Sequence, residues 1–166
     1  MKGDIARYDH RPIADDPLKS VGAKIARLWN SKGQEKIDTL RRMMQSLMME
    51  YGSVFRNEEG LKQGIEGIRS LKERYTQAGV ADQGKVFNYA LMEAIELGHQ
   101  LDLAELVLTS ALYRKESRGA HFRNDFPVRD DRNYLKHTFL FPTFQGPEVR
   151  YKPVKITRFQ PAARIY

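Results

Sequence analysis

The chain has 166 residues, of which 41% are hydrophobic and 30% are charged, and it contains no cysteine. This composition indicates neither a disordered chain nor a membrane span, and the length suits one compact domain with or without a tail. Without cysteine, disulfides, thiolate metal sites and cysteine nucleophiles are excluded as well.

The net charge of +7 is unevenly placed along the chain. Residues 1–112 hold 16 Lys and Arg against 16 Asp and Glu, whereas residues 113–166 hold 12 against 5. The whole positive excess therefore belongs to the C-terminal third, where it favours an anionic or acidic partner surface. The first residues carry scattered charges and no apolar stretch, so we expect neither a signal peptide nor direct membrane insertion. The expected location is the cytoplasm, or the cytoplasmic face of a membrane through a larger complex.

Helix signals begin near the N-terminus. Asp16 followed by Pro17 is typical of a helix start and predicts a short helix that ends near Gly33. From Glu35 onward, apolar residues recur at spacings of three and four, and Gly52 is well placed to end this second helix. Its predicted buried side consists of Ile37, Leu40, Met44, Leu47 and Tyr51.

Two longer helices are predicted next. Asn57 can cap the first of them, and Gly79 is placed to close it. Its predicted buried side consists of Leu61, Ile65, Ile68, Leu71, Tyr75 and Ala78. The same alternation predicts that the last helix buries Phe87, Ala90, Ala94, Leu97, Leu101, Ala104, Leu108 and Ala111. Gly60, Gly64 and Gly67 weaken the first of these two helices and favour close helix contact there.

The predicted fold is all-α, an antiparallel three-helix bundle of the spectrin-repeat kind with a short N-terminal helix. Residues 134–141 and 148–156 flank a proline and glycine turn, so they predict a small β-hairpin on the end of the bundle, followed by a tail. The expected division is an N-terminal segment 1–33, a bundle 34–119 and a basic C-terminal segment 120–166.

Residues 113–138 combine arginines, carboxylates, two histidines and aromatic side chains. One interpretation is a helix end at which Arg114, Lys115 and Arg118 favour the dipole, Gly119 takes the left-handed conformation and the remaining charges are solvated. A second is a metal site made by His121, Asp125, Asp130, Asp131 and His137, although their spacing matches no established ligand motif. A third is nucleic-acid binding, which the interspersed carboxylates disfavour.

The interpretation that we favour for this stretch is an ion-pair network docked on another polypeptide surface. Mixed charges and aromatic side chains are typical of partly desolvated ion pairs at such a contact. In this network the arginines Arg118, Arg123, Arg129 and Arg132 pair with the carboxylates Glu116, Asp125, Asp130 and Asp131.

The stretch "ESRGAHFRNDFPVRDDRNYLKHT", residues 116–138, closely resembles the C-terminal segment of succinate dehydrogenase and fumarate reductase flavoprotein subunits. "YGSVFRNEEGLKQGIEGIRSLKERY" is similar to the preceding helices of that family, and "PAARIY" to its ending. The resemblance covers residues 16–166. L-aspartate oxidase shares the domain and an "ESRG" element, but the "RDD" and "LKHT" runs look more like the dehydrogenase side. Tyr134 departs from the tryptophan that the family commonly has before "LKHT".

The resemblance implies a structural and docking domain of an oxidoreductase that exchanges hydride and protons between succinate and fumarate at FAD and passes electrons to an iron–sulfur subunit. In the family, FAD and the catalytic residues belong to earlier segments, so we expect this chain to bind no cofactor or metal and to be non-catalytic alone. Its expected partners are the FAD-binding and capping domains and the iron–sulfur subunit, and not nucleic acid.

The resemblance carries over a domain-docking motif and no catalytic residue. The motif consists of Glu116, Ser117, Arg118, Gly119, His121, Arg123, Asp125, Arg129, Asp130, Asp131 and His137. The alternatives that stay open are a stand-alone basic helical interaction module, either a protein adaptor or a nucleic-acid binder, and the C-terminal domain of L-aspartate oxidase.

Overall fold

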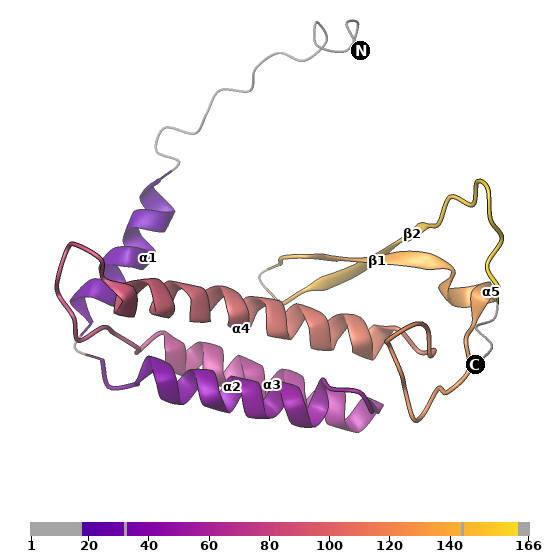
Figure 1. Ribbon diagram of the computed structural model, residues 1–166, viewed down its shortest axis with the longest axis horizontal. Helices are drawn as coiled ribbons and strands as arrows, with labels where there is room; N and C mark the ends of the chain where they lie inside the picture. The colour runs from indigo at the N-terminus through magenta and orange to yellow at the C-terminus, as the bar shows by residue number, and fades with distance from the viewer. Residues whose placement is uncertain (1–17, 32, 144, 163–166) are drawn as a thin grey trace, which may run out of the picture.

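Three antiparallel helices form the centre of the molecule, with a fourth helix and a hairpin laid against one of them (Figure 1). The computed structural model describes residues 18–31, 33–143 and 145–162. In chain order the elements are α1 Lys19–Asn30, α2 Ile37–Tyr51, α3 Glu58–Tyr75, α4 Tyr89–Tyr113, α5 Asp131–Tyr134, β1 Lys136–Phe141 and β2 Glu148–Pro153. The predicted fold class, a helical bundle with a C-terminal hairpin, is confirmed. The predicted helix start at Asp16 and Pro17 lies outside the described residues.

The core fills the space between α2, α3 and α4. Its most buried members come from the predicted apolar faces, and they include Leu40, Leu61, Ile68, Leu97, Leu101 and Leu108, each at most 1% exposed. A smaller cluster joins α1 to the N-terminal half of α4 through Leu28, Val80 and Ala94. Burial of such aliphatic side chains contributes roughly 1.5–3 kcal/mol each, so these two clusters hold the four long helices together. Within the described residues, no helix is both long and apolar enough to span a membrane.

Helix ends differ from the sequence prediction at three places. Phe87 lies outside α4 and is 83% exposed, because the side chain of Asn88 accepts a hydrogen bond from the Leu91 amide and starts the helix there. α3 ends at Tyr75 and not at Gly79, since the amides of Thr76, Gln77 and Ala78 turn back onto the last carbonyls of the helix. Gly79 instead lies where the chain crosses Ser31, whose carbonyl would clash with a Cβ at this position.

The third difference concerns the end of α4. The helix stops at Tyr113, with Arg114 in an extended conformation. Gly119 does adopt a left-handed conformation, with φ of 58°, but it does so in the tight turn between Arg118 and His121, which exchange two backbone hydrogen bonds. The predicted role of Gly119 as the helix terminator is therefore wrong, although its conformation was expected.

Glycines on α3 allow α2 and α4 to pack closely against α3, as the sequence predicted. A Cβ at Gly64 would lie 2.9 Å from the Cβ of Tyr51 and 3.2 Å from a methyl group of Leu108. A Cβ at Gly67 would lie 2.9 Å from a methyl group of Leu47. The Tyr51 atom is attached directly to the backbone and cannot move aside, whereas the Leu47 methyl group ends a flexible side chain. Gly64 is therefore the more restrictive position.

The hairpin lies beside the C-terminal half of α4 (Figure 1). Its strands pair antiparallel, from Lys136 opposite Pro153 to Phe141 opposite Glu148. Gly146, with φ of 109°, provides the turn that connects them. β1 contacts α4 directly, and the Tyr151 hydroxyl of β2 donates to the Tyr113 carbonyl at 3.3 Å. The predicted hairpin is thus confirmed, but β1 and β2 lie along the side of α4 and not on the end of the bundle as predicted.

We expect Gly64→Ala to destabilise the chain. The intrinsic helix gain of roughly 1 kcal/mol is outweighed by overpacking, which costs about 1–3 kcal/mol in a tight core. Gly22→Ala is the control, because Gly22 lies in α1 with no atom within 4 Å of a Cβ; it should raise the free energy of unfolding by about 1 kcal/mol. Urea denaturation followed by circular dichroism measures both. Equal stabilisation by the two substitutions would contradict the packing described for α3.

Candidate functional site

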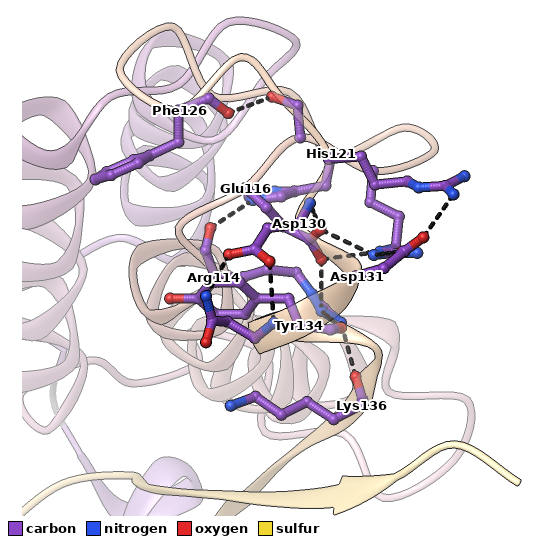
Figure 2. Close-up of polar contacts among 12 residues, drawn as sticks. Arg114, Glu116, His121, Phe126, Asp130, Asp131, Tyr134 and Lys136 are labelled. Atoms are coloured by element: carbon purple, nitrogen blue, oxygen red, sulfur yellow. Dashed lines mark hydrogen bonds and ion pairs between the residues drawn. The ribbon is translucent and has the colours of Figure 1, made fainter. Parts of the chain in front are cut away.

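The side chain of Glu116 is fully buried just beyond the end of α4. Its carboxylate accepts hydrogen bonds from Arg114 at 3.0 Å, from Arg118 at 2.9 and 3.0 Å, and from the backbone amide of Asp130 at 2.9 Å. Figure 2 shows Glu116 close to Arg114 and Asp130. A buried carboxylate is tolerated only when such partners replace water. Glu116 therefore fixes three separate stretches of chain around one anion.

Asp131 extends the network to a third arginine. One of its oxygens accepts from Arg118 at 2.6 Å and the other from Arg129 at 2.6 Å. The hydrogen bond from Arg118 is the main reason why the pKa of Asp131 lies below its usual value. Hydrogen bonding to Glu116, assisted by Asp131, raises the pKa of Arg118. Arg114 continues the network to the carbonyls of Tyr134 and Lys136, at 3.1 and 2.7 Å, and so holds the start of the hairpin.

Arg123 forms a second ion pair and closes the C-terminus of α4. Its guanidinium, which is not exposed at all, donates to both oxygens of Asp125 at 2.7 Å. It also donates to the carbonyls of Ala111 and Leu112, at 2.9 and 3.1 Å. A cation at this end of a helix interacts favourably with the helix dipole. The hydrogen bond from Arg123 is the main reason why the pKa of Asp125 falls from 3.8 to about 2.

Asp125 and Ser117 connect this ion pair to its surroundings. Asp125 also accepts from the backbone amide of Glu58 at 2.9 Å, which ties the segment to the first turn of α3. The Ser117 hydroxyl accepts from the Arg123 amide at 2.9 Å and donates to the Phe126 carbonyl at 2.9 Å. The loop is therefore held to both neighbouring helices.

His121 lies half-buried between two arginines. Arg56 Nη1 is 2.9 Å from its Nδ1, and its Nε2 is 3.0 Å from the carbonyl of Arg114. Because a guanidinium can only donate, Nδ1 is the acceptor and the proton is on Nε2. This arrangement fits the neutral ring, and burial lowers the pKa of His121 from its usual value.

The structure brings together most of the residues that the sequence singled out, but it leaves His137 and Arg132 out of the network. Within the described residues, Arg132 forms no ion pair, so its predicted pairing with a carboxylate is wrong. His137 lies on the exposed side of β1, edge to face with Phe139. Asp130 contributes its amide to the network, while its carboxylate caps α5 by accepting from the Asn133 amide at 3.0 Å. Sequence reasoning missed Arg56, because its loop is distant in sequence and carries no periodic signal.

Two alternative interpretations of this stretch are wrong. The charges are not simply solvated beyond a helix end, since Glu116 and Arg123 are fully buried. The proposed metal ligands do not gather either: His121 is engaged by Arg56, and Asp125 by Arg123. Among the residues that the structure describes, no three Asp, Glu or His side chains are placed to share a metal ion.

We expect Glu116→Ala to lower the free energy of unfolding by about 3–5 kcal/mol, since it leaves two arginines and a backbone amide without their acceptor. Glu116→Gln keeps the shape and one acceptor, so it should cost less. Chemical denaturation at neutral pH distinguishes the two. A loss below about 1 kcal/mol for Glu116→Ala would mean that water replaces the carboxylate.

Asp125→Asn should destabilise the chain in a pH-dependent manner. A carboxylate whose pKa is lowered by folding contributes its stability above the pKa of the unfolded state, 3.8, and loses it as pH falls through about 2. The difference between wild type and variant should therefore be largest, about 2 kcal/mol, at neutral pH, and most of it should be lost by about pH 2. Urea denaturation from pH 7 down to pH 2 measures it. A difference that does not change with pH would contradict the ion pair.

Comparisons with known proteins agree with the resemblance seen in the sequence. The family described as "Fumarate reductase flavoprotein C-term" matches residues 41–166. The chain is 42% identical to the fumarate reductase flavoprotein subunit of Haemophilus influenzae, over 97% of this chain and 27% of that protein. It is 36% identical to the succinate dehydrogenase flavoprotein subunit of Rickettsia bellii, over 95% of this chain and 28% of that protein.

A solved structure gives the same result. An E. coli quinol fumarate reductase variant matches with a TM-score of 0.82 and 38% identity, over 88% of this chain and 26% of that one. The chain spans about a quarter of the length of the curated relatives it matches. It therefore belongs to the fumarate reductase flavoprotein C-terminal family and corresponds to the C-terminal part of succinate dehydrogenase and fumarate reductase flavoprotein subunits.

Proposed function

We propose that this chain is the structural and docking part of a flavoprotein subunit that interconverts succinate and fumarate. In this proposal the remainder of the subunit binds FAD and carries out the reaction, and electrons pass to an iron–sulfur subunit. The names of the relatives support the reaction class. The chain covers only a small share of their length, which favours a structural role over a catalytic one. The proposed location is peripheral, on the cytoplasmic face of a membrane through the full complex.

The observation that carries the proposal is the buried ion network at the basic end of the bundle. Buried ion pairs are weak evidence for stability, because desolvation offsets much of the attraction, and their better attested use is to fix one conformation. Here the pairs of Glu116, Arg118 and Asp131 give residues 114–135 a defined shape. A preformed surface loses little conformational entropy on association. The docking motif named from the sequence fits this use.

The described residues of this chain do not form a site that fits FAD. Dinucleotides are commonly bound where a strand leads through a glycine-rich turn into a helix, whose N-terminus receives the pyrophosphate. In the described part of the chain, both strands follow the bundle and pair with each other in a hairpin. We therefore assign FAD to the remainder of the subunit. The proposed division is a segment 1–33, a bundle 34–119 and a basic segment 120–166, with the docking motif across the boundary between the last two.

Arg129→Glu tests the docking role more cleanly than a change at Arg118. Arg118 supports the buried Glu116, whereas Arg129 is 30% exposed and its loss leaves Asp131 paired with Arg118. The experiment joins this chain to the flavin-carrying part of a related subunit and measures co-purification of flavin and of the iron–sulfur subunit. We expect Arg129→Glu to reduce assembly about tenfold or more, because the new carboxylate would repel an acidic partner surface or lose an ion pair with it.

The matched control is Arg42→Glu, which changes the same charge on an arginine side chain that is 76% exposed on α2. It should assemble as the wild type does, and circular dichroism should show both variants helical. If the wild-type chain itself fails to assemble with the flavin-carrying part, the proposed function is wrong. Normal assembly of Arg129→Glu would contradict the proposal that the basic end of the bundle makes the docking contact.

A further inference from the structure

An open groove of about 480 Å³ lies between the C-terminal half of α4 and β1. Its floor includes Leu103 and Val107 of α4, and its walls include Arg56, His121, Lys136 and Thr138. The groove adjoins the buried ion network through Arg114, whose guanidinium is held by Glu116 and donates to the Lys136 carbonyl. The lining therefore joins an apolar floor to cationic walls.

The floor belongs to a helix that is apolar around most of its circumference. One side of α4 buries Leu97, Leu101 and Leu108 against the other bundle helices. On another side, Leu103 and Val107 remain 59% and 47% exposed. A helix that is apolar on all sides is normally buried on all sides. The exposed side of α4 thus has the composition of a surface that another polypeptide covers.

The walls carry positive charge that lacks a counter-ion. Arg56 donates to the Gly52 carbonyl at 3.0 Å and to neutral His121 at 2.9 Å, and burial lowers its pKa. The ammonium group of Lys136 lies 3.8 Å from the ring centre of Tyr151. Within the described residues, neither cation has an ion pair, and the groove lining includes no carboxylate. A half-buried guanidinium in these surroundings favours an incoming anion.

We propose that the groove receives a segment of the flavin-carrying remainder of the subunit that presents an aliphatic side chain next to an Asp or Glu. The aliphatic group covers Leu103 and Val107, and the carboxylate pairs with Lys136 and Arg56. A small polar anion alone would leave the apolar floor in water, so a polypeptide is the better occupant. This inference rests on the proposed function and adds to it the surface and the chemistry of the partner.

Two substitutions test the two halves of the groove separately. Leu103→Glu places charge on the floor, and Lys136→Glu reverses a wall charge while the Lys136 backbone carbonyl still accepts from Arg114. The matched controls are Met49→Glu, at an aliphatic side chain 73% exposed on α2, and Arg42→Glu. The probe is the flavin-carrying part of a related subunit, and its affinity for each variant is measured by titration calorimetry.

We expect each groove variant to weaken binding about tenfold to hundredfold, and each control to stay within about twofold of the wild type. Affinity of the wild type should also fall with salt, and that of Lys136→Glu should do so less. Circular dichroism checks that every variant remains helical. If Leu103→Glu unfolds the chain, the milder Leu103→Ser replaces it with the same expected direction.

The outcomes separate the two proposals. If the wild-type chain does not bind the flavin-carrying part, the proposed function fails and the groove assignment fails with it. If the wild type binds and the groove variants bind as tightly as the controls, the groove assignment alone is overturned. Saturable binding of sodium succinate to the isolated chain, abolished by Lys136→Glu, would show a small-molecule site and would also overturn it.

Discussion

The burial of a single carboxylate, that of Glu116, organises the C-terminal third of the molecule. Its donors come from the end of α4, from the turn that follows it and from the segment before α5. Because each donor satisfies the same anion, none of these stretches can move far without leaving a buried charge unpaired. The basic character of this region therefore produces a fixed shape and not a diffuse positive tail.

The bundle provides the platform on which that shape is built. Close contact of α3 with α2 and α4 at Gly64 brings the helices together and allows the end of α4 to meet the first turn of α3. Asp125 uses that proximity, since it accepts from the Glu58 amide while it pairs with Arg123. Helix packing and the ion network are thus parts of one arrangement, in which apolar contacts set positions and charged contacts set conformation.

Much of this arrangement could be predicted from sequence. The alternation of apolar residues on α2, α3 and α4 gave their buried faces, because one helical face must meet the core. Helix ends were less predictable: Phe87 continues the apolar spacing, but the cap formed by Asn88 decides where α4 begins. Arginine–carboxylate pairing was evident from composition. The contact of Arg56 with His121 was not, since it joins loops 65 residues apart.

The closure of α4 by Arg123 has a consequence for how the chain acquires its structure. The last carbonyls of the helix are satisfied by a guanidinium that lies ten residues beyond the end of that helix. During synthesis, the final turn of α4 therefore waits for residues 116–125 to emerge before its hydrogen bonds are complete. The apolar core between α2, α3 and α4 can form earlier. Folding of this molecule therefore begins with the apolar core and ends with the ion pairs near the C-terminus.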